Sequence, residues 1–212
     1  MKLHKTELDG VVLIEPAVFG DDRGWFMESF NEARFETALL ELGLPAPARF
    51  VQDNHSCSKA GVLRGLHYQL PPHAQGKLVR VVRGAAWDVA VDLRRGSASF
   101  GRWVGAELSE ANRRQLWIPP GFAHGFLALC DDTHFLYKTT DVYARDCERA
   151  IRWDDPALGI RWPLPAGLDA PLVAAKDAVA PLFAQAEMPR TEAPTEAPTE
   201  APTEGPQGES KR

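Results

Sequence analysis

The sequence predicts a mainly β protein, a jelly-roll barrel with a few short helices and a disordered C-terminal tail. Three observations lead to this fold class. Short runs rich in β-branched and aromatic residues recur at a spacing of roughly ten residues, which is typical of sandwiches and barrels. Glycine, proline, asparagine and aspartate separate these runs. A short repeat with a proline in every unit ends the chain, and such a repeat forms neither a helix nor a β-ladder.

One helix is predicted near the start of the chain. Asn31 is a suitable N-cap, Phe35, Leu39 and Leu42 recur at the spacing of one helix face, and Gly43 ends the pattern. We therefore expect a short amphipathic helix between Asn31 and Gly43.

The clearest strand signal is an alternation of residue types between positions 86 and 93. Trp87, Val89, Val91 and Leu93 alternate with alanine and aspartate, which predicts a strand with one buried face. The run 77–83 precedes it and ends at Gly84, so we expect these two strands to form a hairpin. Further strands are predicted at residues 102–108, 115–118, 124–130 and 134–140.

The C-terminal part divides into an irregular segment and a repeat. Prolines at 156, 163, 165, 171 and 181 leave room for short helices at most. From residue 191 the tetrapeptide Thr-Glu-Ala-Pro recurs, with glycine in place of alanine in its last copy. We therefore expect one folded domain over residues 1–186 and a disordered tail over residues 187–212.

The bulk composition excludes several classes of protein. The net charge is −5, and the predicted tail contributes −3 of it, so a broad basic surface for nucleic acid is not expected. The three cysteines have no paired or zinc-type spacing. No apolar stretch is long enough for a signal peptide or a membrane span, and no Gly-rich dinucleotide motif is present. We expect a cytoplasmic protein with no membrane partner and no nicotinamide cofactor.

Two histidine motifs carry the functional signal. His67 and His124 are spaced as in the two signature motifs of cupin barrels, but Gln69 and Lys77 occupy positions that hold metal ligands in those proteins. Two imidazoles beside an ammonium group make a poor cation site, because three or four convergent ligands are usual. We predict no metal, and acid–base chemistry by the side chains themselves.

The motifs together resemble the dTDP-4-dehydrorhamnose 3,5-epimerase family, deoxysugar nucleotide epimerases of the cupin superfamily. The resemblance implies a cupin-type jelly roll that binds a dTDP-sugar and uses no cofactor. The matching stretches run in order through nearly all of the chain before the repeat: residues 22–28, 51–56, 62–69, 75–81, 118–126, 135–140 and 176–177.

This resemblance implies a catalytic role for four residues. His67 matches the general base that removes protons alpha to a 4-keto group, and Asp177 matches the acid that orients it. Lys77 matches the residue that stabilises the enolate. Tyr137 matches the tyrosine that supplies a proton from the opposite face.

The resemblance also implies the residues that bind the substrate. The arginines contact the diphosphate, the two amides bond within the pocket, and the second tyrosine packs on the thymine. Phe26 and Glu28 are supplied by the neighbouring subunit of a homodimer with exchanged N-terminal strands. The full set of implied binding residues is Arg23, Phe26, Glu28, Gln52, Asn54, Arg64, His124, Tyr143 and Lys176.

Several alternatives remain open at the level of sequence. Related enzymes of antibiotic sugar pathways epimerise at C3 only or C5 only, and the presence of Tyr137 favours the double epimerase. A sugar 3,4-ketoisomerase would move the keto group itself. A metal-dependent cupin would use His67 and His124 as ligands, and a binding module would hold the sugar nucleotide without turnover.

Overall fold

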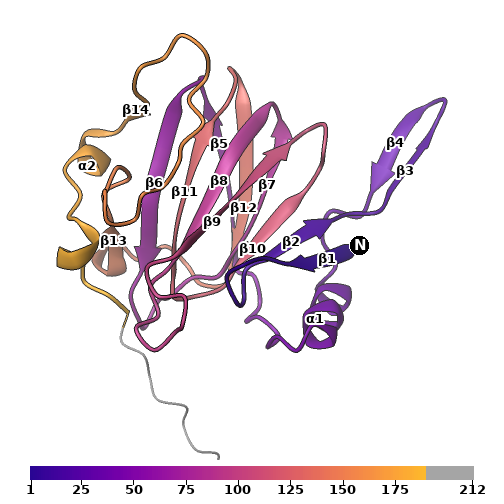
Figure 1. The fold of residues 1–212 in the computed structure, drawn as a ribbon. Helices are drawn as coiled ribbons and strands as arrows, with labels where there is room; N and C mark the ends of the chain where they lie inside the picture. Colours follow the sequence, from indigo (N-terminus) through magenta and orange to yellow (C-terminus); the bar gives the residue numbers. More distant parts are fainter. Residues whose placement is uncertain (190–212) are drawn as a thin grey trace, which may run out of the picture.

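Two antiparallel β-sheets that pack face to face form the body of the protein in this computed structural model, which describes residues 1–189 (Figure 1). One sheet has the strand order β1-β2-β10-β7-β12-β5. The other has the order β13-β6-β11-β8-β9, with β14 pairing parallel to β6. The mainly β, jelly-roll prediction is confirmed. The strands of these two sheets are β1 (Lys2–Lys5), β2 (Val12–Glu15), β5 (Gln52–Ser58), β6 (Val62–Gln69), β7 (Lys77–Arg83), β8 (Ala85–Asp92), β9 (Trp103–Ser109), β10 (Gln115–Ile118), β11 (Phe122–Ala128), β12 (Thr133–Thr139), β13 (Glu148–Ala150) and β14 (Leu172–Val173).

The predicted hairpin of β7 and β8 is wrong, because the two strands belong to different sheets. β7 pairs with β10 and β12, whereas β8 pairs with β9 and β11. The chain crosses between the sheets at Gly84, which has φ +76. A Cβ there would lie 2.8 Å from Thr133 Oγ1 and 2.9 Å from Cys130 Sγ, so only glycine fits this crossing. Alternation of residues indicates a strand, but it does not indicate the partner strand.

The prediction of one buried face for β8 is also wrong, because both faces are buried. Val89 and Val91 pack beneath the C-terminal segment, together with Ile151. Ala86 and Ala90 face the space between the sheets. The alternation of valine with alanine and aspartate therefore separates two buried environments, and the small residues lie on the inner side.

The core between the sheets is apolar over most of its length. Leu116 and Ile118 from one sheet and Phe122 from the other are almost completely buried there. Phe126 of β11 and Phe135 of β12 stack across the gap with ring centroids 4.0 Å apart. Because β11 and β12 lie in different sheets, this pair is a direct contact between the two layers.

The predicted helix is confirmed as α1 (Glu32–Glu41). The Asn31 side chain caps it by accepting a hydrogen bond from the Arg34 backbone N–H. Phe35 and Leu39 are buried against the outer face of the β2–β10 region, where Trp117 also packs. Each such side chain contributes about 1.5–3 kcal/mol on burial, so the helix is fixed by its apolar face.

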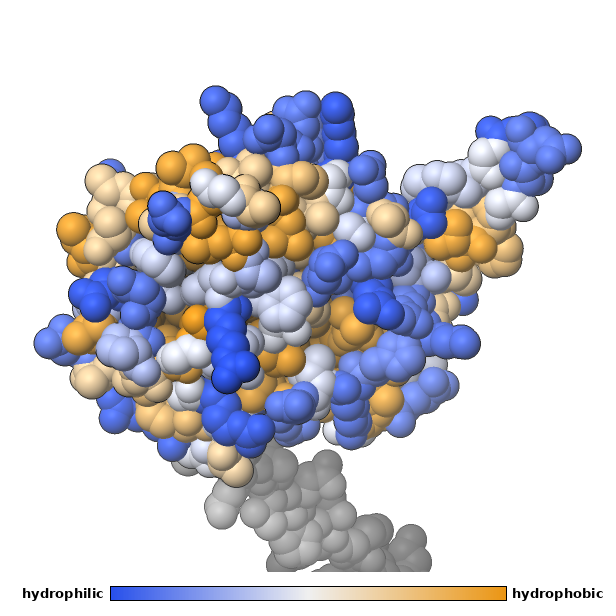
Figure 2. Space-filling view, turned by 45° about the horizontal axis from the view of Figure 1, so that its top comes forward, coloured by the Kyte–Doolittle hydropathy of each residue, from blue (hydrophilic) through white to orange (hydrophobic). Residues whose placement is uncertain are grey.

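A two-stranded hairpin, β3 (Val18–Asp21) and β4 (Gly24–Met27), projects from the body as an arm. Figure 1 shows it pointing away from the two sheets, and Figure 2 shows that its tip is hydrophilic while apolar side chains gather toward its base. Phe19, Trp25 and Phe26 are 66%, 56% and 67% exposed. Exposed apolar groups on one element are typical of an interaction surface.

The C-terminal segment is irregular, as predicted, with only the short elements η1 (Arg145–Cys147), α2 (Ala175–Ala178) and η2 (Phe183–Gln185) beside β13 and β14. Tyr68 Oη donates to the Glu187 carbonyl at 2.6 Å, and Met188 is buried. The Thr-Glu-Ala-Pro repeat of the predicted tail lies outside the described residues. Within residues 1–189, none of the helices has the length and apolar character needed to cross a membrane.

Candidate active site

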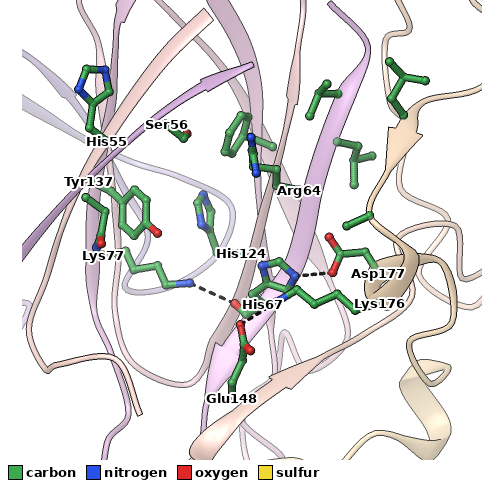
Figure 3. A pocket seen from close by; sticks show the side chains of 16 residues that line it. His55, Ser56, Arg64, His67, Lys77, His124, Tyr137, Glu148, Lys176 and Asp177 are labelled. Atoms are coloured by element: carbon green, nitrogen blue, oxygen red, sulfur yellow. Dashed lines mark hydrogen bonds and ion pairs between the residues drawn. The ribbon is translucent and has the colours of Figure 1, made fainter. Parts of the chain in front are cut away.

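A cavity of about 390 Å³ opens where strand β5, at the edge of one sheet, faces β6 of the other. This volume falls in the range of small-molecule sites. Figure 3 shows charged and aromatic side chains converging on it from both sheets and from the C-terminal segment. The lining residues are Asn54, His55, Ser56, Val62, Leu63, Arg64, His67, Lys77, His124, Phe126, Tyr137, Glu148, Leu172, Ala174, Lys176 and Asp177.

His67 and Asp177 form a hydrogen-bonded pair on one wall of the cavity. The Nε2 atom of His67 lies 2.7 Å from Asp177 Oδ1, although 110 residues separate them in sequence. The Asp177 side chain is 3% exposed, and that of His67 is 25% exposed. Burial opposes charge on Asp177, but the hydrogen bond and charge of His67 outweigh it and lower the pKa of the carboxyl group. An ionised Asp177 holds the proton on Nε2, so Nδ1 is left free to accept one.

A second histidine–aspartate pair lies deeper in the cavity. His124 Nε2 is 2.8 Å from Asp88 Oδ2, and Asp88 is fully buried. Burial lowers the pKa of His124, although the Asp88 charge opposes this effect. His124 and His67 are directly opposite each other in the β11–β6 ladder, so the two imidazoles are neighbours.

Lys77 supplies a buried cation at the floor of the cavity. Its Nζ donates to the backbone carbonyl of His67 at 3.2 Å, and the residue is 8% exposed. Burial lowers the pKa of Lys77 to about 8, against the attraction of Asp88 and Glu148. The ammonium group is therefore available at neutral pH and has few competing partners.

Tyr137 faces the His67 wall from the other sheet (Figure 3). Burial raises the pKa of its phenol above the ordinary value, so the hydroxyl keeps its proton at neutral pH. Arg64 lies on β6, and its Nε donates to Ser58 Oγ at 3.2 Å. The base candidate and the phenol thus come from opposite layers of the sandwich.

Polar residues at the lower rim form one connected group around Glu148. Lys176 Nζ lies 3.1 Å from one carboxylate oxygen, and Tyr143 Oη donates to the other at 3.0 Å. Gln52 Nε2 donates to Asn54 Oδ1, and Gln52 Oε1 accepts from the Tyr143 backbone N–H at 2.9 Å. Burial opposes the charge of Glu148, but the hydrogen bonds from Lys176 and Tyr143 outweigh it and lower the pKa of the carboxyl group.

Five predicted site residues are not among the lining residues of this cavity. Gln52 and Tyr143 lie at its rim, whereas Arg23, Phe26 and Glu28 do not reach it within one chain. Arg23 and Phe26 lie on the arm, and the Arg23 side chain is 90% exposed and paired with Asp21. Glu28 follows the arm, where it pairs with Arg34 at 3.0 Å. The arm therefore holds the predicted nucleotide-side residues away from the cavity of their own chain.

Gln69 and Lys77, at the two positions that hold metal ligands in other cupin barrels, have other roles here. Gln69 is buried and bonds to the backbone of His73, Val142 and Ala144. Lys77 occupies the second position. Among residues 1–189, no group of three or more histidine, cysteine, aspartate or glutamate side chains is arranged to hold a metal ion.

Two of the ionisable residues at this site are not predicted from the sequence. The pattern of β8 places Asp88 only among the polar positions of a strand, yet a carboxylate on the small-residue side of that strand is a signal that it faces the interior. Glu148 belongs to no motif. It follows the short helix η1, and only the pairing of β13 with β6 brings it to the cavity.

Comparisons with known proteins agree on one family. The model of the family described as dTDP-4-dehydrorhamnose 3,5-epimerase matches residues 5–185. The chain belongs to this family of isomerases. The predicted resemblance is confirmed, together with the enzyme class.

Individual relatives are similar along most of their length. The dTDP-4-dehydrorhamnose 3,5-epimerase of Pseudomonas aeruginosa is 56% identical over 187 residues, which are 88% of this chain and 98% of that protein. The dTDP-6-deoxy-D-glucose-3,5-epimerase of Legionella pneumophila, solved with dTDP-4-keto-L-rhamnose, is 47% identical with a TM-score of 0.82, covering 91% and 99% of the two chains. The 3'-monoepimerase ChmJ of Streptomyces bikiniensis, solved with dTDP-quinovose, is 36% identical with a TM-score of 0.76, covering 85% and 87%.

Proposed function

We propose that this enzyme epimerises dTDP-4-dehydro-6-deoxy-D-glucose at C3 and C5 to give dTDP-4-dehydro-L-rhamnose, in dTDP-rhamnose biosynthesis. One observation carries the proposal: the His67–Asp177 pair faces Tyr137 across a cavity that holds a buried ammonium group. A base, an acid on the opposite face and a cation between them are the groups that inversion of a carbon next to a ketone requires.

The reaction begins with removal of a proton alpha to the ketone. His67 Nδ1 takes the proton, and the electron pair of the C–H bond moves to the C4 oxygen as an enolate. The Asp177 carboxylate stabilises the imidazolium that forms and keeps the ring in one orientation. A second imidazole, that of His124, lies beside this centre and is hydrogen-bonded to Asp88. Burial lowers its pKa, which favours the neutral form.

Lys77 then stabilises the enolate oxygen, and Tyr137 returns a proton to the carbon from the other face. A desolvated ammonium is effective in this role because the low local dielectric strengthens its attraction for the oxyanion. The phenolate regains a proton and the imidazolium loses one to solvent, so the enzyme is restored without metal or cofactor. The same cycle at the second alpha carbon completes the double epimerisation.

Substrate binding uses the polar residues around the cavity and the arm of a second chain. Arg64 and Arg23 bind the diphosphate, while Gln52, Asn54 and Lys176 supply further hydrogen bonds. Tyr143 is 53% exposed at the rim, where its ring is free to pack on the thymine.

A homodimer completes the site in this proposal, through exchanged N-terminal segments. The exposed aromatic groups of the arm support it, because more than half of the surface of Phe19, Trp25 and Phe26 stays uncovered in their own chain. Phe26 and Glu28 would reach the nucleotide of the partner.

Isotope exchange tests the reaction. The purified enzyme is incubated with dTDP-4-keto-6-deoxyglucose in deuterated water and followed by NMR. Deuterium at both C3 and C5 with inversion supports the proposal, and exchange at one carbon alone identifies a mono-epimerase. Migration of the keto group would identify a ketoisomerase, and activity lost to chelators would identify a metal enzyme.

The cellular location and the division of the chain are further parts of the proposal. A cytoplasmic location is tested by cell fractionation. The proposed division is an epimerase domain of residues 1–186 and a separate tail over 187–212. Because Glu187 and Met188 contact the folded part, the test uses a chain that ends after Met188 and lacks only the rest of the tail. Unchanged exchange activity in that chain supports the division.

A further inference from the structure

The inner face of β5 is a row of hydrogen-bonding side chains. Gln52, Asn54, Ser56 and Ser58 alternate with more exposed residues and point toward the space between the sheets. Gln52 bonds to Asn54 and to the Tyr143 backbone, and Ser58 Oγ accepts from Arg64 Nε. The polar side chains at the two ends of the row, Gln52 and Ser58, therefore have hydrogen-bond partners within the protein itself.

Ser56 is different from its neighbours in this row. Its Oγ is buried and has no hydrogen-bond partner within residues 1–189. A hydroxyl that is removed from water without a partner lowers stability. The residue nevertheless lines the cavity, where Figure 3 shows it between His55 and Arg64. A rotation about the Cα–Cβ bond moves a serine hydroxyl between staggered positions without any backbone change.

Arg64 identifies the chemistry of the missing partner. Its Nε is occupied by Ser58 Oγ, which brings the guanidinium across to β5, two residues from Ser56. The terminal nitrogens of Arg64 make no hydrogen bond to residues 1–189, so they are free for an anion. A planar guanidinium and an adjacent hydroxyl donor are well suited to the non-bridging oxygens of a phosphoryl group.

We infer that Ser56 is a substrate-binding residue whose hydroxyl turns into the cavity and donates to a phosphoryl oxygen of the diphosphate held by Arg64. This inference rests on the proposed function for the identity of the ligand. It adds a donor that belongs to none of the motifs of the sequence. The free hydroxyl gains its hydrogen bond only when the diphosphate is bound, so its cost in the empty enzyme contributes to affinity for the ligand.

Calorimetric binding of dTDP and of dTDP-4-keto-6-deoxyglucose tests the inference in the full-length enzyme. Ser56→Ala is expected to weaken the binding of both ligands about tenfold, equivalent to about 1.4 kcal/mol. It raises KM in the exchange assay by a similar factor and changes kcat by less than about threefold. Ser56→Thr retains the hydroxyl and recovers most of the dTDP affinity.

Ser58→Ala is the matched control for the effect on stability, because its hydroxyl already has a protein partner, Arg64. Its Tm is expected to fall, whereas the Tm of Ser56→Ala stays at or above that of the wild type since no hydrogen bond is lost. Wild-type dTDP affinity in Ser56→Ala would overturn the inference. Weaker binding of the dTDP-sugar alone would also overturn it, because the hydroxyl would then contact the sugar. A wild-type enzyme that binds dTDP but exchanges no deuterium refutes the proposed reaction and leaves the Ser56 result to be decided by binding.

Discussion

Replacing Asp177 with asparagine would remove the charge that orients His67 while keeping the shape of the site. In the structure, Asp177 Oδ1 accepts from His67 Nε2 at 2.7 Å, and the carboxylate is 3% exposed. In the Asp177→Asn variant the side-chain amide would instead donate to Nε2. Such a bond favours the tautomer with its proton on Nδ1, and that atom is the one that must accept the substrate proton.

The size of the effect follows from two contributions. A hydrogen bond to a charged group contributes about 1.5–3 kcal/mol, and the imidazolium formed during proton removal loses this stabilisation. At about 1.4 kcal/mol per tenfold change in rate, the loss alone slows the reaction by about 10- to 150-fold. The wrong tautomer adds a further penalty, so we expect Asp177→Asn to reduce kcat by about 10²–10⁴.

Deuterium exchange at C3 and C5, measured by NMR with saturating substrate, gives kcat, and calorimetry gives the affinity for dTDP. Affinity is expected to change by less than about threefold, since the carboxylate acts through His67. Asp141→Asn is the control, because Asp141 pairs with His73 at 3.3 Å outside the cavity. A kcat for Asp177→Asn within threefold of the control would refute the orienting role.

Three further predictions concern other parts of the molecule. Burial lowers the pKa of Lys77 to about 8, so its ammonium group loses a proton as pH rises through that value, and kcat/KM should fall above about pH 8. Lys77→Arg should move this fall in the pH profile to higher pH, and an unchanged profile would contradict the role of Lys77. Tyr137→Phe should still permit deuterium exchange with retention of configuration but should form at least about tenfold less inverted product, which NMR measures as the ratio of exchanged to epimerised sugar. An equal loss of exchange and of epimerisation would count against proton donation by the phenol. Gly65 has φ +141, and an added Cβ would lie 2.5 Å from Gly125 Cα, so Gly65→Ala should lower the free energy of unfolding by about 2 kcal/mol or more. Wild-type stability in thermal unfolding would show that β6 and β11 can move apart at no cost.

The sequence was sufficient for local structure and for residues that belong to motifs. Asn31 and the apolar positions after it predict α1 correctly, and the strand-like runs predict six of the fourteen strands, β7 to β12, to within a few residues. The partner strands were not predictable in the same way. A glycine turn such as that at Gly84 is compatible both with a hairpin in one sheet and with a crossing to the other sheet. Which of the two forms depends on contacts with β12.

The limits at the site have the same origin. Asp177 lies in an irregular, proline-rich region, so its contact with His67 depends on the path of the whole segment. Strand pairing brings Asp88 and Glu148 to the site. The local pattern indicates at most that Asp88 faces the interior, and it indicates nothing for Glu148. Arg23 belongs to one of the matching stretches but lies on the arm, where its side chain is 90% exposed and away from the cavity of its own chain.

The stacked rings of Phe126 and Phe135 bear on the distance between the proposed base and the proposed acid. His67 belongs to one sheet, whereas Tyr137 and Lys77 belong to the other, and the aromatic pair separates these layers near the cavity. A thinner or thicker spacer at this point would change the gap that the sugar ring must span between base and acid. The width of the apolar core is therefore a parameter of the proposed chemistry, and a residue such as Phe135, which is not among the lining residues of the cavity, can influence the stereochemical outcome through it.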